Sequence, residues 1–446
     1  MKTVQIIGGG FAGTEAALFL ASRGYEVVLF EMRPGTSTPV HLTADLAEPV
    51  CSNSFKSLEL ENASGLLKEE LLLMGSSLVP LAMEQRVPAG KALAVDRQAF
   101  SRAATQLAEQ RGVRIRREEV TSLLPFLQGE APVLVCTGPL TTDGLLQEFG
   151  ALWNTENAHF FDAIAPIVEA QSINRSRSFW MDRYGTPGEG DYLNCPLTEP
   201  EYRSFWEEVV EAPVAPVEAF DRKDLFERCQ PFEEIARSGF DALRFGPMKP
   251  VGLVDPATGK QPYAVVQLRQ DNHQKNFFSP VGFQTRLKWG AQKKVLQMIP
   301  ALEEVNIVRY GVMHKNVYLE SARILDAFFR VQPCLLPPQA PPVFFAGQIT
   351  GLEGYVESMA GGLYVARNLD RFFRGLPLER FPEDTMCGAL FSYVSSTLPL
   401  KPMYANFGLL PDISGKKRER RRKKAIRALD SVRRFLQQEE ENVDAL

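Results

Sequence analysis

The distribution of apolar and polar residues at the start of the chain predicts a strand, a helix and a second strand. Val4 to Ile7 form a short, mainly apolar run, and the segment from Thr14 to about Arg23 predicts an apolar helix that ends at Gly24. A second apolar run covers residues 27–30. This order and spacing are typical of a parallel, doubly wound sheet.

Two later apolar runs have the length of buried strands in the same sheet. The first covers residues 131–136 and leads into the turn 137–139, and the second covers residues 342–346 and leads into Gly347. Strands that face a ligand often end in such glycine-containing turns. We therefore expect both turns to line one crevice.

The pattern changes between about Phe160 and Leu319. Aromatic-rich alternating segments, such as residues 263–268 and 306–310, accompany helical patterns over residues 199–210 and 222–238. Strands and helices mixed in this way, without regular alternation, predict an inserted α+β domain.

The glycine-rich segment after the first strand has the spacing of a dinucleotide-binding turn. In G-x-G-x-x-G the first glycine makes the turn, the second admits a pyrophosphate, and the third lets the helix pack on the strand. Glu31 stands at the end of the second strand, placed to accept a hydrogen bond from a ribose 2′-hydroxyl. The expected cofactor contacts in this unit are Gly8, Gly9, Gly10, Phe11, Ala12, Gly13, Glu31 and Arg33.

A second glycine-rich segment favours FAD over NAD as the dinucleotide. Residues 345–355 read FAGQITGLEGY and run into a helix of small residues over 358–362. In flavoproteins a turn of this type brings backbone and a helix N-terminus to the flavin end of FAD. The expected contacts here are Gly138, Gly347, Gly351, Glu353 and Gly354.

Together these patterns predict an α/β protein with a doubly wound, Rossmann-like FAD-binding domain. Residues 1–160 would form its first part, residues 161–320 the inserted α+β domain, and residues 321–446 its second part with a charged helical C-terminus.

The chain resembles the folate- and FAD-dependent tRNA uracil-5-methyltransferases, relatives of the flavoprotein that modifies wobble uridines. The wobble-uridine relatives carry a long C-terminal helical domain, whereas only residues 355–446 follow Gly354, which favours the methyltransferase. The motifs that carry the resemblance are GGGFAGTEAA at the start, LFEMRP (29–34), EPVCSNSF (48–55), RVPAGKALAVDR (86–97), CTGPLT (136–141), DYLNCPLT (191–198), FGPMKPVGLVDP (245–256), VVQLRQDN (265–272), VGFQTRLKW (281–289), RYGVMHKN (309–316), GLEGY (351–355) and MYANFG (403–408).

The resemblance implies methylation of a T-loop uridine in tRNA at C5 (tRNA position 54), with methylenetetrahydrofolate as carbon donor and NAD(P)H reducing the flavin. C5 becomes nucleophilic once a thiolate adds at C6, and a base must later remove the C5 proton. Two cysteines match family motifs, Cys51 and Cys229. Cys229 has neighbouring cations that favour a thiolate, but which cysteine attacks and which acts as base stays open.

The other four cysteines are interpreted as structural, with Cys136 in a strand, Cys195 before a proline, and Cys334 and Cys387 in loops. No C-x-x-C spacing is present, so we expect no metal site. His314 is a candidate to stack on the pterin of folate, or else is a half-buried structural histidine. The candidates for folate glutamate or RNA phosphate are Arg269, Lys288 and Arg309.

Composition limits how nucleic acid would be bound. The net charge is −4, so a basic surface must be local. Residues 416–424 read KKRERRRKK, which fits either phosphate contacts or a solvated helix face. The N-terminus enters a strand at once, with neither a signal peptide nor a membrane span, and predicts a cytoplasmic protein whose oligomeric state the sequence leaves open.

Two other functions fit part of the pattern. A plain FAD-dependent NAD(P)H oxidoreductase acting on a small molecule would account for the glycine motifs but not for the basic tail. An RNA-binding protein stabilised by a structural flavin, with little catalysis, would account for the tail but would not need a thiol.

Overall fold

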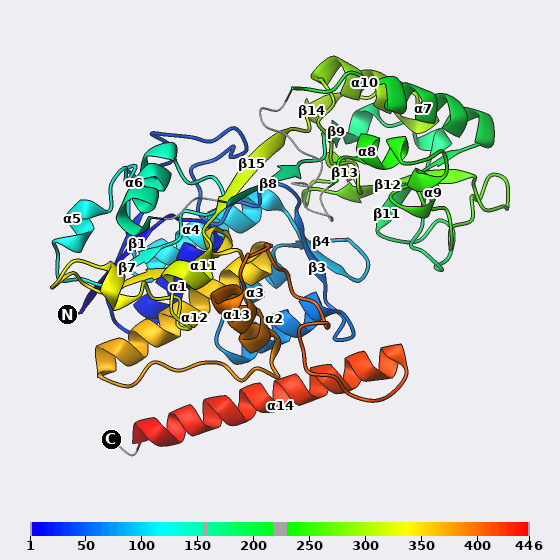
Figure 1. The fold of residues 1–446 in the computed structure, drawn as a ribbon. Helices are drawn as coiled ribbons and strands as arrows, with labels where there is room; N and C mark the ends of the chain where they lie inside the picture. Colours follow the sequence, from blue (N-terminus) through cyan, green and yellow to red (C-terminus); the bar gives the residue numbers. More distant parts are fainter. Residues whose placement is uncertain (1, 155–157, 217–229, 445–446) are drawn as a thin grey trace.

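A parallel five-stranded sheet forms the centre of the molecule in the computed structural model, which describes residues 2–154, 158–216 and 230–444 (Figure 1). The strand order is β16-β7-β1-β2-β6, and every neighbouring pair is parallel. The strands are β1 (Thr3–Ile7), β2 (Glu26–Phe30), β6 (Arg114–Arg116), β7 (Val133–Val135) and β16 (Val343–Phe345). The predicted α/β class and parallel sheet are confirmed.

Burial explains why the central strands were readable from sequence. In β7 and β16 every residue is buried, because helices and loops cover both faces of the sheet. β1 pairs with β2 on one side, from Thr3 opposite Glu26 to Ile7 opposite Phe30, and with β7 on the other. This register brings the carboxyl ends of β1, β2, β7 and β16 to one edge.

Helices α1 (Phe11–Ser22) and α12 (Tyr355–Arg374) pack closely beside this sheet. A Cβ on Gly362 of α12 would lie 2.1 Å from the carbonyl oxygen of Ala12 in α1, so only glycine allows this approach. The helix predicted from Thr14 in fact begins at Phe11, inside the glycine motif. The prediction placed the start too late because glycine and alanine carry no apolar periodicity.

A second, six-stranded sheet lies apart from the first and is antiparallel, in the order β10-β11-β12-β13-β9-β14. Its apolar core is separate and is covered by helices that include the predicted one from residue 199. The elements are β9 (Ile167–Glu169), β10 (Phe179–Trp180), β11 (Tyr192–Leu197), β12 (Ala264–Gln270), β13 (Phe277–Pro280), β14 (Ile307–Arg309), α7 (Glu199–Glu211), α8 (Phe232–Arg237), α9 (Ala242–Phe245) and α10 (Trp289–Gln297).

Two smaller sheets join these parts. β8 (Ala158–Ala163) pairs antiparallel with β15 (Met313–Tyr318) and forms the ribbon that leads to and from the second sheet. A three-stranded sheet contains β3 (Ser54–Ser57), β4 (Arg86–Val87) and β5 (Ala92–Val95). The ribbon occupies the predicted junctions near residues 160 and 320. The division into domains at those positions stays a prediction.

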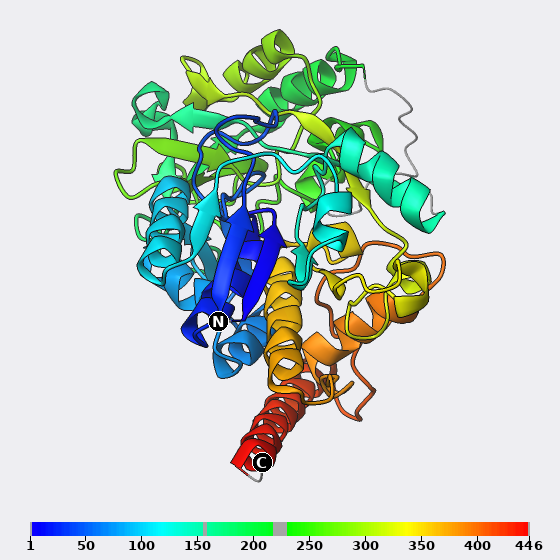
Figure 2. The same cartoon turned by 90° about the vertical axis from the view of Figure 1, so that its left-hand side faces the viewer.

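The C-terminal helix α14 (Lys417–Asp444) runs along the base of the molecule in Figure 1 and is seen nearly end-on at the bottom of Figure 2. Its buried residues Ala425, Ala428, Leu429 and Val432 join the main core. Lys424 is also buried and donates to the carbonyl oxygens of Phe407 and Leu410 and to Asp412. One lysine of the basic run is therefore structural, whereas residues 416–420 are exposed.

The remaining helices surround the main core. None of the helices in the described ranges is both long and apolar enough to cross a bilayer. They are α2 (Ala63–Leu73), α3 (Leu78–Glu84), α4 (Arg97–Gln110), α5 (Leu124–Leu127), α6 (Asp143–Trp153), α11 (Ser321–Ile324) and α13 (Met386–Ser396), with 3-10 turns at Ala170–Ser172, Arg175–Arg177, Pro300–Leu302, Pro333–Leu335 and Gln348–Thr350.

Candidate functional site

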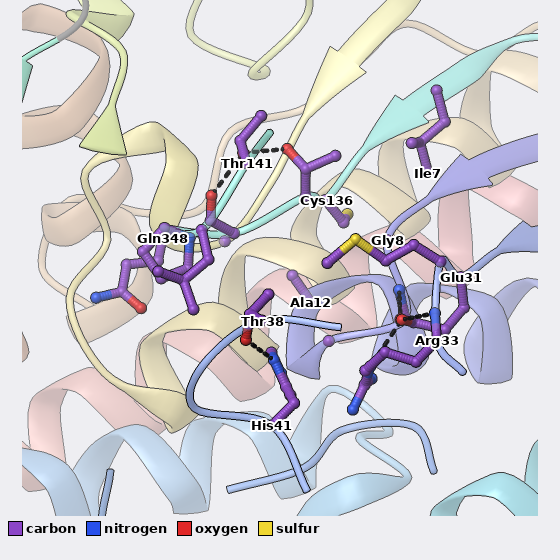
Figure 3. A pocket seen from close by; sticks show the side chains of 18 of the residues that line it. Ile7, Gly8, Ala12, Glu31, Arg33, Thr38, His41, Cys136, Thr141 and Gln348 are labelled. Carbon is purple, nitrogen blue, oxygen red and sulfur yellow. Dashed lines mark hydrogen bonds and ion pairs between the residues drawn. The ribbon is translucent and has the colours of Figure 1, made fainter. Parts of the chain in front are cut away.

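A pocket of about 1040 Å³, including the open space at its mouth, lies at the carboxyl edge of the parallel sheet. The ends of β1, β2 and β7, the turn after β16 and the start of α12 line it. In Figure 3, Glu31 and Arg33 lie on one side of the pocket and Gln348 on the other. Residues 8–12, 137–139 and 347–348 line this pocket together, whereas Gly13, Gly351, Glu353 and Gly354 are not among its lining residues. The expected cofactor contacts stay a prediction.

In the first glycine segment, residues 8–13, every glycine except one is in close contact with neighbouring atoms. Gly8 has a φ of +104°, and a Cβ there would lie 2.4 Å from the carbonyl oxygen of Cys136. A Cβ on Gly13 would lie 2.0 Å from the carbonyl oxygen of Gly8. A Cβ on Gly10 would meet no atom within 4 Å. Gly10 therefore faces the open pocket, at the N-terminus of α1.

The N-terminus of α1 presents backbone donors to this space. Gly10 is the N-cap residue, and no side chain caps the helix, whose first turn also contains no acidic residue. The first N–H groups of a helix have no intrahelical partner and carry the positive end of its dipole. This arrangement suits a phosphate group.

Glu31 is buried, and its carboxylate binds both the glycine segment and the residues that follow β2. Its carboxylate accepts hydrogen bonds from the backbone N–H of Gly9 at 3.0 Å and from Nε of Arg33 at 2.7 Å. Arg33 in turn contacts Glu48 at 3.0 Å. Burial opposes ionisation of Glu31, but Arg33 and the two N–H donors outweigh it and lower its pKa. The group is an ionised acceptor at the edge of the pocket.

The second glycine segment closes the other side of the crevice. Gly347 has a φ of +83°, and a Cβ there would lie 2.8 Å from Cβ of Ala12 in the first segment. The turns at Gly351 and Gly354 also have positive φ. Glu353, between them, is buried and accepts a hydrogen bond from Nε2 of Gln348. Burial raises the pKa of Glu353 to about 8, with the nearby Asp162 adding to the effect.

Cys51 lies beside the pocket and contacts Tyr355, the first residue of α12. Its Sγ is 2.9 Å from the Tyr355 hydroxyl, which also accepts the backbone N–H groups of Cys51 and Ser52. The Tyr355 ring stacks on Phe11 with 4.6 Å between centroids. Burial raises the pKa of the Cys51 thiol to about 11, and the hydrogen bond from Tyr355 opposes that rise. The thiol is neutral in this state.

Two of the predicted anion-binding arginines hold the loop around Cys51. Arg269 donates from Nε to Asn53 at 2.8 Å and from Nη2 to Ser52 at 2.9 Å. Arg309 donates to the carbonyl oxygens of Val40 and Val50. Their binding to folate or RNA stays a prediction, and their guanidinium groups already position this loop. Lys288, by contrast, is exposed at the N-terminus of α10.

His314 lies on the ribbon, directly across from Asp162, and its side chain is 10% exposed. Its Nε2 lies 4.0 Å from Asp162 Oδ2. Burial lowers the pKa of His314, so the imidazole is neutral, with Asp162 opposing the change. Nδ1 of His314, Oδ1 of Asp162 and Oδ1 of the neighbouring Asn316 are buried without a hydrogen-bond partner among the described residues. Three such atoms on one short ribbon indicate a site for a polar ligand.

The remaining predicted thiols fall into two groups. Cys229 lies outside the described residues. Cys136 and Cys195 are buried in or beside strands, and Cys334 is exposed. Cys387 was expected in a loop, but that prediction is wrong, because it lies buried in the first turn of α13. In the described ranges no cluster of three or more His, Cys, Asp or Glu side chains could hold a metal ion.

Sequence reasoning did not single out several side chains that the fold brings to the site. Tyr355 is the last residue of the GLEGY motif. Arg97 and Asp271 form a buried ion pair at 3.1 Å, and they lie at or next to the ends of the motifs at 86–97 and 265–272. Arg97 also donates to the carbonyl oxygen of Pro49, before Cys51. His41 lines the pocket beside Thr38. For Tyr355, Arg97 and Asp271 the available signal was their place in a motif, whereas His41 lies in none of the quoted motifs.

The chain is similar to known proteins over nearly its whole length. Residues 3–377 match the family model of glucose inhibited division protein A. The chain is 56% identical over 440 residues to the methylenetetrahydrofolate–tRNA-(uracil-5-)-methyltransferase TrmFO of Thermotoga neapolitana, covering 97% of this chain and 99% of that protein. It is 54% identical over 441 residues to the enzyme of the same name from Thermotoga maritima, covering 98% and 99%.

Among solved structures, Aquifex aeolicus GidA in its form I crystal superposes with a TM-score of 0.68 at 15% identity, covering 97% of this chain and 75% of that one. The likeness at this identity concerns the fold. The matches to the curated relatives extend over nearly the whole of both chains. The chain therefore belongs to the TrmFO family of methylenetetrahydrofolate–tRNA-(uracil-5-)-methyltransferases, within the wider GidA-related group.

Proposed function

We propose that this protein methylates C5 of a uridine in the T-loop of tRNA, at tRNA position 54, with methylenetetrahydrofolate as carbon donor and with FAD reduced by NAD(P)H. The observation that carries the proposal is the crevice between the two glycine segments, with Cys51 beside it, in a chain of the TrmFO family. The proposed site of action is the cytoplasm, where tRNA would be the substrate.

The residues of the crevice fit FAD. Gly10 leaves open space at the uncapped N-terminus of α1, where the pyrophosphate would accept backbone N–H groups. Glu31 has accepting capacity left for a ribose hydroxyl, since three of about four lone-pair sites are used. The turns at Gly138 and Gly347 would hold the flavin end. Bound there, FAD would supply the electrons and carry the one-carbon unit.

The ribbon residues support a folate site next to this crevice. The neutral imidazole of His314 offers an uncharged face for stacking a pterin. The pterin edge carries N–H donors, and Asp162 has a buried oxygen without a partner among the described residues. We assign Asp162 and His314 to this ligand. Of the three cations proposed for folate glutamate or RNA phosphate, Lys288 is exposed, whereas Arg269 and Arg309 are partly buried. Exposure therefore favours Lys288 as the ligand of an anion.

Uridine C5 becomes a nucleophile only after a thiolate adds at C6 and places negative charge on the ring. We assign this attack to Cys229 and place Cys51 beside the flavin, where it would remove the C5 proton or position the cofactor. A Cys51 thiol with a pKa of about 11 is a poor acid in this state. Tyr355 donates its hydroxyl proton to Sγ, since its own oxygen accepts two N–H groups, and so stabilises a Cys51 thiolate when one forms.

Trapping with 5-fluorouridine tests the proposal. Fluorine at C5 cannot leave as a proton, so after thiolate attack and carbon transfer the protein stays joined to the RNA and migrates as an adduct on a denaturing gel. Cys229→Ala should abolish the adduct and leave FAD content intact, whereas Cys334→Ala, an exposed control thiol, should not.

The alternatives give different results. Trapping that survives Cys229→Ala and disappears with Cys51→Ala would invert the two roles. An adduct that survives both substitutions would exclude a cysteine nucleophile at either position. No adduct with any variant, together with NAD(P)H oxidation that tRNA does not affect, would instead favour an FAD-dependent oxidoreductase of a small molecule.

A further inference from the structure

Two aromatic rings, one of them exposed, stack on each other at the start of α10. Trp289, the first residue of α10, lies face to face with Tyr310, with 5.3 Å between ring centroids and 20° between planes. Trp289 is 63% exposed, whereas Trp153 is buried and Trp180 and Trp206 are partly buried. An exposed tryptophan supported by a second ring presents a flat apolar surface with nothing from the described residues covering it.

Hydrogen bonds connect this stack to the Cys51 loop. Arg309, which precedes Tyr310, donates to the carbonyl oxygen of Val50, and Val50 lines the crevice and precedes Cys51. On the other side, Gln292 of α10 bonds both the N–H and the carbonyl oxygen of Gly311. Figure 1 shows α10 beside β14, above the ribbon that carries His314. The stack is therefore held in fixed relation to the site.

Two exposed lysines lie near Trp289 along the chain: Lys288 comes directly before it and Lys293 one helical turn after it, and neither forms an ion pair among the described residues. Lys294 of the same helix, by contrast, pairs with Glu208 of α7. No acidic side chain stands in the first turn of α10. A flat aromatic surface flanked by cations fits an unstacked nucleotide, whose base stacks on the ring and whose phosphates face the lysines. A protein surface would require no such flanking charge.

We propose that Trp289 and Tyr310 form a stacking platform for one unpaired nucleobase of the RNA substrate, next to the uridine that enters the site. This inference rests on the proposed function for the identity of the RNA. A uridine in a structured loop must leave its stack to reach a buried site, and its neighbour then loses a stacking partner. The platform replaces that partner and fixes the loop while the target base is inside.

Trp289→Ala tests the platform, with Trp289→Phe as the conservative variant and Phe245→Ala as a matched control at an aromatic residue that is 81% exposed on α9. We expect Trp289→Ala to weaken binding of unmodified tRNA transcript about tenfold, Trp289→Phe much less, and Phe245→Ala not at all. The salt dependence of binding should be unchanged in Trp289→Ala, because no charge is lost, and should flatten in Lys288→Ala/Lys293→Ala.

Two further measurements identify the occupant. Adding tRNA should quench tryptophan fluorescence in the wild type and much less in Trp289→Phe. Transcripts with an abasic site at single T-loop positions should bind the wild type more weakly at one position, and Trp289→Ala should be insensitive to that same position.

Other results would overturn the platform. Equal binding of tRNA by Trp289→Ala and wild type would do so, as would a change of oligomeric state in Trp289→Ala by light scattering, which would make the stack an interface between copies of the chain. A protein that neither binds nor methylates tRNA would contradict the proposed function itself, whereas tRNA methylation unaffected by Trp289→Ala would contradict the platform alone.

Discussion

Replacing Gly10 should separate the stability of the fold from the binding of FAD. A side chain at this position meets no atom within 4 Å, and the backbone at φ −73° and ψ −168° is extended, so any L-residue can adopt it. Gly10→Ala reduces the entropy of the unfolded chain, which stabilises the folded protein by about 0.4–1 kcal/mol. Alanine is also a poorer N-cap residue than glycine, which destabilises α1 by about as much. The free energy of unfolding of the apoprotein should therefore stay within about 0.5 kcal/mol.

The same methyl group, and more so the side chain of Gly10→Val, occupies the space in front of the α1 N-terminus. Loss of one or two charge-assisted hydrogen bonds to the pyrophosphate should weaken FAD by about 2–4 kcal/mol, or roughly 30- to 700-fold in Kd. The assay pairs urea unfolding of the apoprotein with flavin fluorescence titration.

Gly13→Ala is the matched control for this experiment. Its Cβ would lie 2.0 Å from the carbonyl oxygen of Gly8, so it should destabilise the apoprotein itself by about 1–3 kcal/mol. Unchanged FAD affinity in Gly10→Val would refute the location of the pyrophosphate. A Gly10→Val apoprotein as unstable as Gly13→Ala would refute the reading of Gly10 as facing open space.

Two further predictions concern pH and salt. Burial raises the pKa of Glu353 from 4.5 to about 8, so the folded state binds the Glu353 proton more tightly than the unfolded state does. This contribution to stability is full below pH 4.5 and is lost as the pH rises to about 8. Glu353→Gln should remove that part of the decline in urea midpoints with pH, and an unchanged pH profile would contradict the prediction. Replacing five bases of the tail should weaken binding to all tRNAs alike and flatten the dependence of binding on salt, whereas an unchanged slope would identify this run as a solvated helix face. The residues are the exposed Lys416, Lys417, Arg418 and Arg420 and the partly buried Arg421.

The central sheet was predictable because parallel strands buried on both faces appear as continuous apolar runs, as in residues 131–136 and 342–346. The glycine motif was predictable because only glycine permits the contacts at Gly8 and Gly13. The start of α1 was placed late, since small residues give no periodic signal. The pairing of β8 with β15 joins strands about 150 residues apart and leaves no local pattern.

The site was less predictable than the fold because its side chains meet across large sequence separations. Arg269 reaches Ser52 and Asn53, and Arg309 reaches Val50, over more than 200 residues. A lone arginine in a motif fits two roles equally well, a ligand of an anion or a hydrogen-bond donor that holds the structure. The same holds for Tyr355, whose hydroxyl bonds only become visible once α12 is placed against the Cys51 loop.

Direct detection of the product tests the central claim. Purified protein reconstituted with FAD would be incubated with unmodified tRNA transcript, methylenetetrahydrofolate and NADPH under low oxygen, and the nucleosides would be separated by mass spectrometry. We predict 5-methyluridine at a single T-loop position, with its methyl carbon derived from isotopically labelled folate and its formation lost when folate or FAD is left out. NADPH oxidation without any 5-methyluridine in tRNA would contradict it.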